Sequence, residues 1–515
     1  MIARTRDEAL FPLPLWERNP VVGFGDCPGV QAAGTYSSAT MPNTIARAIA
    51  RRCALPPTDD VEIAIIGAGM AGIAAAYYLS MRHGRSRVAL IDRGQPMGLT
   101  SAASGENYRN WWPHPVMTEF TDRSIDLMEA VARDTGNRIR MTRRGYALAT
   151  RSADPRKLIE QLHRGYGADA GAAIRIHDGK GATTYAPPLA ADWEGAPAGV
   201  DVLLDRDLIR RTFPGFAGDI AAVLHIRRAG DISGQQLGQY MLEHIRESGG
   251  VVRRGSVTGI DKQRSKQGRF VLAVERDGAT EIMRADILVN AAGPYLVEIA
   301  ALLDETLPVE TVLQQKIAFR DGRGAIPRAM PFAIDLDGQA LDWNTEERAT
   351  LAADASRAWL THPLPGGIHC RPDGGDTGQW IKLGWAYNRM PSAPLAEPEF
   401  DPSFPEIVLR AASRLNPSLK EYYGRLPRER VHYGGYYTMT RENWPLIGRM
   451  RTEGAFVVGA LSGFGTMAAC AAGELCAKWI AGAVRPGYAD KLSLARHEDE
   501  ELMTELIGAG SKGVL

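Results

Sequence analysis

The chain has 515 residues, of which 45% are hydrophobic and 23% charged, a composition typical of a soluble globular protein with two or three cores. Sixty Lys and Arg residues balance sixty Asp and Glu residues, which argues against nucleic acid or an anionic membrane surface as the main partner. No segment approaches the roughly 18 apolar residues of a membrane-spanning helix, and the N-terminus lacks the apolar centre of a signal peptide.

The cysteines are five in number and have no C-x-x-C spacing, which favours neither a disulfide framework nor a zinc site. They are Cys27, Cys53, Cys370, Cys470 and Cys476. We therefore expect reduced thiols, a cytoplasmic location and no bound metal.

Residues 1–60 are rich in Pro, Gly, Ser and Thr and contain one short candidate helix at 43–52. We expect an N-terminal extension that wraps the surface or mediates contacts between subunits of a homo-oligomer. A disordered segment is the alternative.

The most informative stretch comes directly after this extension. A β-branched run at 61–66 predicts a buried parallel strand, and three glycines in G-x-G-x-x-G order lead from it into a helix. Gly67 permits the sharp turn, Gly69 leaves room for a diphosphate, and Gly72 lets the helix lie close to the sheet. Asp92, twenty residues after Gly72 and at the end of a second apolar run, is placed to bind ribose hydroxyls. Because the helix N-terminus also attracts phosphates, the segment predicts an adenine dinucleotide site.

The rest of the chain lacks the regular βα repeats of a nicotinamide dehydrogenase. Its patterns predict helices at 117–135, 345–359 and 466–480, a loop and helix at 230–249, and strands at 88–91, 146–149, 251–254, 287–289, 379–387 and 455–459. We predict an α/β protein with a discontinuous Rossmann-like nucleotide-binding domain and a second, mostly antiparallel β-sheet domain for the substrate. The first comprises 61–145, 226–300 and 440–485, the second 146–225 and 301–439, and 486–515 form a tail. Within the second, 321–378 is either a lid or a surface insertion, with a hairpin turn at Gly374-Gly375.

Four blocks of sequence carry a resemblance to a known family. They are the motif at 61–92, TSAASGENYR at 100–109, LVNAAGPY at 288–295, and the stretch at 436–474 that begins YYTMTRENWPLIGR and ends FVVGALSGFGTMAACAAGE. Together they resemble the glutathione-reductase-type flavoprotein fold and, within it, the D-amino-acid oxidase and sarcosine oxidase superfamily. The resemblance covers nearly everything from residue 61 to about residue 490 and implies FAD as the cofactor.

The resemblance places the cofactor against residues from several of these blocks. The implied contacts are Gly67, Gly69, Met70, Ala71, Gly72, Asp92, Arg93, Thr100, Ser101, Gly105, Val257, Ala291, Ala292, Gly293, Gly463, Phe464, Gly465, Thr466 and Met467. In the family, the helix that begins near Thr466 faces the pyrimidine carbonyl of the flavin. Its dipole would stabilise the negative charge that accumulates there on reduction.

The stretch QWIKLGWAY at 379–387 resembles the sarcosine oxidase strand whose lysine lies near the flavin and assists oxygen reduction. Lys382 takes that position and is the expected catalytic residue. A lysine that points to solvent from an edge strand is the alternative, since the alternation with Ile381 and Leu383 fits both cases.

Three positions depart from the sarcosine oxidase pattern. Ala386 replaces a histidine, Met467 replaces a lysine that binds the substrate carboxylate, and Gly434 or Gly435 replaces the cysteine that links the flavin covalently. These departures imply that FAD is bound noncovalently. Arg109 is the candidate carboxylate clamp, and a purely structural arginine is the alternative.

Aromatic side chains gather in the same blocks. Trp385, Tyr436 and Tyr437 form a candidate wall for a bulky or cationic amine, although core packing is the usual role of such residues. With Met467 in place of lysine, they indicate a substrate larger or less acidic than sarcosine.

The resemblance implies flavin-dependent oxidation of a C–N bond in an amino acid or a secondary or tertiary amine. Hydride passes to FAD N5, the imine product is hydrolysed, and O₂ is reduced to H₂O₂ unless an electron carrier takes its place. One alternative is an FAD-dependent dehydrogenase of 2-hydroxy acids or alcohols, which would need a base that the sequence does not reveal. Another is a flavoprotein assembly factor without turnover. The sequence leaves the amine, the electron acceptor and the oligomeric state open.

Overall fold

The computed structural model describes residues 60–180, 184–188, 193–263 and 269–508. The predicted extension, except for its last residue, lies outside them. Two large sheets dominate the fold of the described residues, and they confirm the predicted class of a Rossmann-like sheet with a second, mostly antiparallel sheet.

The first sheet has a parallel centre. Its strands are β1 (Asp60–Ile66), β2 (Val88–Asp92), β9 (Val251–Arg254), β10 (Ser256–Lys262), β11 (Phe270–Arg276), β12 (Ala279–Asn290), β18 (Leu446–Arg449) and β19 (Ala455–Gly459). The order is β10-β11-β12-β1-β2-β9, with β19 beside β12 and β18 beside β19. β1 pairs in parallel with β2 and β12 and is buried from Ile63 to Ile66, which explains why these four residues are all apolar.

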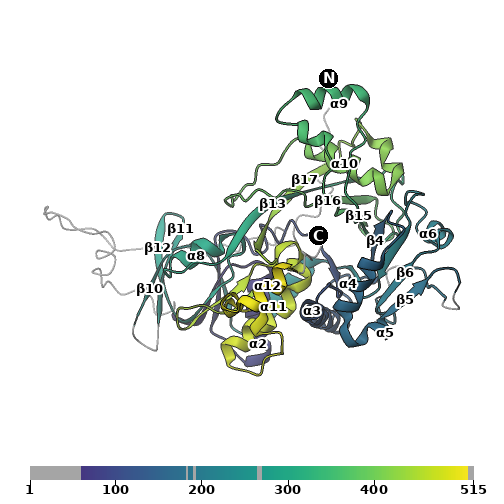
Figure 1. Cartoon of the computed structure of the whole chain (residues 1–515). Helices are drawn as coiled ribbons and strands as arrows, with labels where there is room; N and C mark the ends of the chain where they lie inside the picture. The colour runs from purple at the N-terminus through teal and green to yellow at the C-terminus, as the bar shows by residue number, and fades with distance from the viewer. Residues whose placement is uncertain (1–59, 181–183, 189–192, 264–268, 509–515) are drawn as a thin grey trace, which may run out of the picture. The chain divides into compact units, whose positions relative to one another are not determined.

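Four helices form the core on one face of this sheet. They are α2 (Met70–His83), α3 (Pro115–Asp134), α7 (Gly234–Glu247) and α11 (Gly465–Ala481), and α2, α3 and α11 lie together in Figure 1. α8 (Leu296–Ala301) packs on the opposite face. α2 and α11 approach closely because both present small residues, and a Cβ at Gly473 of α11 would collide with the backbone of Ala74 in α2.

The second sheet is longer and mainly antiparallel. Its strands are β4 (Tyr146–Thr150), β5 (Ile174–His177), β6 (Val200–Leu203), β7 (Ala222–Ile226), β13 (Val309–Arg320), β14 (Phe332–Asp335), β15 (Ile368–Asp373), β16 (Trp380–Trp385) and β17 (Arg430–Thr440), in the order β17-β13-β16-β15-β14-β4-β7-β6-β5. A separate ribbon pairs β3 (Asn107–Arg109) with β8 (Ala229–Asp231). The remaining helices are α4 (Arg156–Tyr166), α5 (Ala170–Ala173), α6 (Arg206–Thr212), α9 (Thr345–Ala353), α10 (Phe404–Leu415) and α12 (Glu500–Gly508), of which α10 covers β13, β15 and β16.

Most predicted elements are present, with shifted ends. β9 and β19 match their predicted ranges, and the Gly374-Gly375 turn lies between β15 and β16, with both glycines at positive φ. The helix predicted at 345–359 is wrong in its second half. α9 ends at Ala353 because the carboxylate of Asp354 accepts hydrogen bonds from the amide and hydroxyl of Ser356, which favours a turn. The two sheets draw their strands from the segments assigned to the two predicted domains, while the domain boundaries themselves stay a prediction.

Within the described ranges, no helix is both long and apolar enough to cross a membrane. The three cysteines of these ranges, Cys370, Cys470 and Cys476, are buried free thiols.

The α2–α11 contact gives a stability prediction. Gly473→Val inserts a branched side chain where the backbones touch, and we expect it to lower the free energy of unfolding by at least ~1–3 kcal/mol. Thermal unfolding measures this. The control is Gly487→Val, since a Cβ at Gly487 meets no atom within 4 Å. Equal melting temperatures for the two variants would contradict the close packing.

Candidate functional site

Two adjoining cavities run along the carboxyl ends of the parallel strands. The outer cavity, of about 380 Å³, lies between the β1–α2 turn, the end of β2 and the segment after β12. The inner cavity, of about 120 Å³, lies between residues 100–105, β17 and the start of α11. The two share lining residues, among them Gly69, Thr100, Ser101, Ala291 and Gly293, so they form one elongated site. Ligands of open parallel sheets bind at this edge.

The wall of the outer cavity is a tight backbone crossing. Gly67 has φ +111°, and a Cβ there would collide with the carbonyl of Ala291 at the end of β12. A Cβ at Gly72 would collide with the carbonyl of Gly67 itself. Both glycines are therefore needed for the β1–α2 turn to lie against β12, as the motif predicted.

The N-terminus of α2 opens toward this site. Its N-cap, Gly69, provides no side-chain hydrogen bond, and the amide of Met70 donates to Oγ of Ser101 over 3.1 Å. The following segment, with Ala71, also lines the inner cavity. Free amides and the positive end of the helix dipole thus face the space where a diphosphate would lie.

Asp92 is held at the end of β2. Its Oδ2 accepts a hydrogen bond from the amide of Ala68 over 2.7 Å, and its Oδ1 accepts one from the amide of Gly94 over 2.8 Å. These bonds fix the carboxylate against the β1–α2 turn, where it lines the outer cavity. Beside it, the guanidinium of Arg93 lies 3.6 Å from the ring centroid of Tyr295 and shapes the opposite rim. Val257 and Ala292 complete the predicted set at this cavity.

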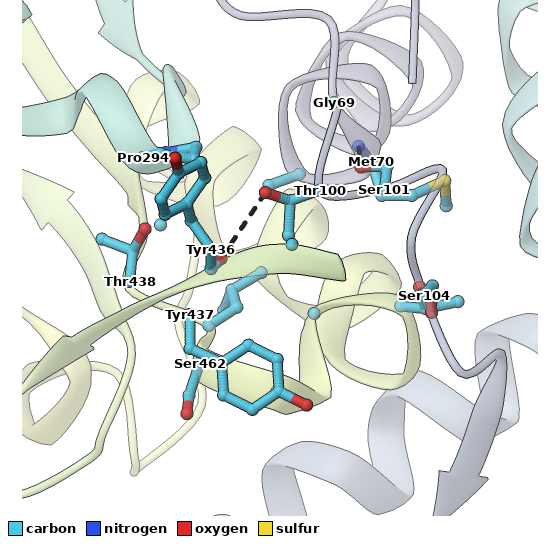
Figure 2. A pocket seen from close by; sticks show the side chains of 18 of the residues that line it. Gly69, Met70, Thr100, Ser101, Ser104, Pro294, Tyr436, Tyr437, Thr438 and Ser462 are labelled. Atoms are coloured by element: carbon cyan, nitrogen blue, oxygen red, sulfur yellow. Dashed lines mark hydrogen bonds between the residues drawn. The ribbon is translucent and has the colours of Figure 1, made fainter. Parts of the chain in front are cut away.

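Glycines let the segments around the inner cavity pack closely against one another. A Cβ at Gly435 of β17 would approach Cβ of Ala103 to 3.2 Å, and one at Gly463 would approach the ring of Tyr437 to 2.6 Å. Figure 2 shows Tyr436 and Tyr437 pointing to opposite sides of β17, with the Thr100 hydroxyl bonded to the carbonyl of Tyr436 over 3.5 Å. Tyr437 is buried, which raises its pKa to about 12, so its hydroxyl stays protonated.

α11 begins at the floor of the inner cavity. Its N-cap makes no side-chain hydrogen bond, and Gly465 and Thr466 line the cavity. The hydroxyls of Thr466 and Ser104 lie 2.7 Å apart and link the helix to the 100–105 loop. The positive end of α11 therefore faces the cavity, as the sequence resemblance implied.

A buried lysine outside the predicted set also lines the inner cavity. Lys316 of β13 is 7% exposed, and its Nζ donates to the carbonyl of Ala103 over 3.2 Å and lies 5.6 Å from the ring centroid of Tyr437. It makes no ion pair within the described residues, and its burial lowers its pKa to about 8. The signal in the sequence is weak: a lysine directly before the apolar run Ile317–Phe319.

Lys382 lies on the same face of the sheet but in a different setting. Its Nζ is 3.2 Å from Oδ1 of Asp373 and 3.4 Å from Oε2 of Glu106, and its side chain is 18% exposed. It is not among the residues that line the two cavities. Two carboxylates balance its charge, and its catalytic role stays a prediction.

Other predicted residues lie beside the cavities rather than on their walls. Arg109 is 2% exposed, stacks 4.8 Å from the ring centroid of Trp112, and has its pKa lowered to about 10 by desolvation. Trp385 belongs to the core of the second sheet, and Phe464 and Met467 belong to the helical core of the first. Their predicted contacts with substrate or cofactor stay untested.

Comparison with known proteins places these features in a family. The profile of the FAD dependent oxidoreductase family (DAO) matches residues 62–479. Similar solved structures include glycine oxidase from Geobacillus kaustophilus (18% identity, TM-score 0.62, covering 85% of this chain and 100% of that one) and L-proline dehydrogenase from P. horikoshii (17%, 0.62, 86% and 98%). Iminodiacetate oxidase from Chelativorans sp. BNC1 is also similar (18%, 0.57, 84% and 98%). A sequence search of curated proteins found no match.

The geometry of the inner cavity predicts the effect of filling it. Gly435→Leu places a side chain against Ala103 and Thr100, and we expect the purified variant to carry less than about one tenth of the FAD of the parent protein. Flavin absorbance per polypeptide measures this. Gly218→Leu, at an exposed glycine with no neighbour within 4 Å of its Cβ position, is the matched control. Full FAD content in the Gly435 variant would overturn the assignment of this cavity.

Proposed function

Because the chain belongs to the FAD dependent oxidoreductase family, we propose that it oxidises a C–N bond of an amino acid or of a secondary or tertiary amine, with O₂ as the electron acceptor. FAD supplies the hydride acceptor for such a reaction. The observation that favours this substrate class is the lining of the site. Among the described residues, no histidine lines the inner or the outer cavity, whereas oxidation of an alcohol needs a base for the hydroxyl proton. His432, the nearest candidate by sequence, instead contacts Oε1 of Gln315 through Nε2.

The described residues fit an extended FAD. The uncapped N-terminus of α2 and the turn at Gly67 would hold the diphosphate, and the carboxylate of Asp92 would hold the ribose. The inner cavity, lined by residues 100–105, β17 and the start of α11, would hold the ring system.

The electrostatics of the inner cavity favour a negatively charged state of the ring system. The N-terminus of α11 and the ammonium group of Lys316 both direct positive charge into the cavity, and no carboxylate of the described residues pairs with Lys316. Because the site is buried and no anion neutralises these charges, they stabilise negative charge on a bound group more strongly than paired or solvated charges would.

The ion pairs of Lys316 and Lys382 indicate which of the two lysines assists the reduction of O₂. A cation stabilises negative charge on a nearby oxygen most strongly when it has no other anion to neutralise it. Lys382 is paired with Glu106 and Asp373, whereas Lys316 lines the cavity without an ion pair to the described residues. We therefore assign the principal role to Lys316 and a supporting one to Lys382.

The neighbouring structures are consistent with this proposal. Their names describe oxidation of glycine, proline and iminodiacetate, each of which contains a C–N bond next to a carboxylate. Because these structures are less than 20% identical to this chain, they are evidence for its fold alone.

A panel of candidate substrates tests the proposed substrate class. Anaerobic mixing of the purified holoenzyme with a panel of amino acids and secondary amines should bleach the flavin band for at least one amine, and admission of air should restore the colour and release H₂O₂. Absorbance and a peroxide assay follow the two steps. Bleaching by 2-hydroxy acids alone would contradict C–N oxidation.

The second prediction separates the two lysines. Lys316→Met should slow reoxidation by O₂ at least tenfold. Reduction by substrate should slow by a smaller factor, because the same charge also stabilises the reduced, negatively charged ring system. Lys382→Met should have a smaller effect. Stopped-flow absorbance measures both half-reactions.

The pH profile of reoxidation provides the control. The pKa of Lys316 is lowered to about 8, so the ammonium form is present below that pH and is lost as the pH rises through it. The parent protein should therefore reoxidise more slowly above pH 8, and Lys316→Met should flatten the profile. An unchanged profile in this variant would assign the role elsewhere.

The third prediction concerns attachment of FAD. Because the resemblance places Gly434 or Gly435 at the position of the linking cysteine, acid precipitation should release all flavin into the supernatant. Colour retained on the pellet would contradict noncovalent binding.

A further inference from the structure

A third cavity, which we call the recess, adjoins the inner cavity. It has a volume of about 230 Å³ and shares Tyr437 and Ser462 with the inner cavity. Both shared residues are labelled in Figure 2, where they lie on the same side of the inner cavity, away from Ser104. The recess is thus the part of the site into which a substrate bound at the inner cavity would extend.

Charged side chains line the far part of the recess. Arg389, Arg441 and Glu310 are all exposed at its rim, and none of them makes an ion pair or a side-chain hydrogen bond within the described residues. By contrast, the guanidinium group of Arg371 on β15, which does not line the recess, pairs with the carboxylate of Asp373. The recess carries a formal net charge of +1 from its three unpaired groups.

The segment that carries Arg389 is fixed to the second sheet. The side chain of Asn388 donates to the carbonyl of Leu313 over 3.0 Å, and that of Gln314 donates to the carbonyl of Asn388 over 2.9 Å. Ser392 is then held by its amide, which donates to the carbonyl of Thr311 over 2.9 Å. The backbone at Arg389 is therefore fixed by the hydrogen bonds of Asn388 on one side and of Ser392 on the other.

Arg441 is fixed in a different way. It follows β17 in a turn closed by Thr440, whose hydroxyl bonds to both the carbonyl and the amide of Trp444. The next residue, Glu442, forms a fully buried ion pair with Arg496, so its charge is not offered to Arg441. Asn443 in the same turn lines the recess, and its buried Oδ1 has no partner among the described residues.

The register of the second sheet places these groups relative to the inner cavity. Tyr437 pairs with Val312, and Glu310 lies two residues further along β13, or about 7 Å at the usual rise of a strand. Glu310, and Arg441 at the end of β17, therefore lie beyond Tyr437 along the sheet.

From this placement we propose that the recess binds one carboxylate of the substrate, remote from the C–N bond, through Arg389 and Arg441. The inference rests on the proposed function and narrows its substrate class to amines that carry an acidic group at the end away from the oxidised bond. Guanidinium groups bind carboxylates with paired, charge-assisted hydrogen bonds.

The charge of Glu310 distinguishes a carboxylate from a phosphate. With a net charge of +1, the recess matches a singly charged anion, and the glutamate would repel the second charge of a phosphate monoester. Glu310 thus acts as a specificity-determining residue at the rim.

Calorimetric titration of the holoenzyme with two unreactive probes tests the proposal. Pentanoate should bind saturably, and pentanamide, which has the same shape without the charge, should bind at least tenfold more weakly. Arg389→Ala and Arg441→Ala should each weaken pentanoate binding at least tenfold, with Arg→Lys at either position restoring part of it.

The control variant is Arg428→Ala, which removes an exposed arginine that lines none of the three cavities. It should leave the affinity for pentanoate unchanged. Glu310→Gln should tighten the binding of pentanoate and allow propyl phosphate, a monoester that is a dianion at pH 8.5, to bind. Thermal unfolding of each variant shows that the fold is retained.

Each outcome has one meaning. Equal affinities for pentanoate and pentanamide, or arginine variants that behave like Arg428→Ala, would overturn the recess proposal even if amines bleach the flavin. Binding of pentanoate that depends on both arginines supports the recess proposal. If no amine bleaches the flavin, that result contradicts the proposed function and leaves the support for the recess unchanged.

Discussion

The close approach of the β1–α2 turn to the end of β12 is the constraint that shapes the site. Gly67 and Gly72 allow it, because a side chain at either position would strike a carbonyl group. The small residues that bring α11 against α2 act in the same way, since they let the N-termini of both helices face one elongated site. The absence of side chains at a few positions therefore creates both the space for a dinucleotide and the positive field around it.

Charge pairing divides the cations around this site into two groups. Lys382 is neutralised by Glu106 and Asp373, and it joins β16 to the 100–106 loop. Lys316, Arg389 and Arg441 lack such partners among the described residues, and each faces a cavity. An unpaired buried cation costs stability, which makes Lys316 a natural candidate for contact with a charge from outside the chain. Arg389 and Arg441 are exposed, and their charges are available to a ligand in the recess.

The sequence was sufficient for the parts of the site that are local in the chain. The glycine motif and Asp92 lie where their pattern predicted them, because residues 61–92 form one continuous β1–α2–β2 unit. The start of α11 was placed by the resemblance alone, and its contact with Ser104 joins residues 362 positions apart. Lys316, Arg389 and Arg441 escaped prediction because their positions depend on the register between β13, β17 and the segment after β16, which no local pattern specifies. Likewise, the partners of Lys382 come from residues 9 and 276 positions away in the chain, so the motif around it could not reveal how its charge is balanced.

A crystal structure of the holoenzyme with pentanoate is the decisive measurement. We expect the flavin ring in the inner cavity, with the N-terminus of α11 at its pyrimidine edge and the carboxylate between Arg389 and Arg441. A ring system located outside the inner cavity, or a recess closed by its own side chains around the bound cofactor, would contradict this arrangement.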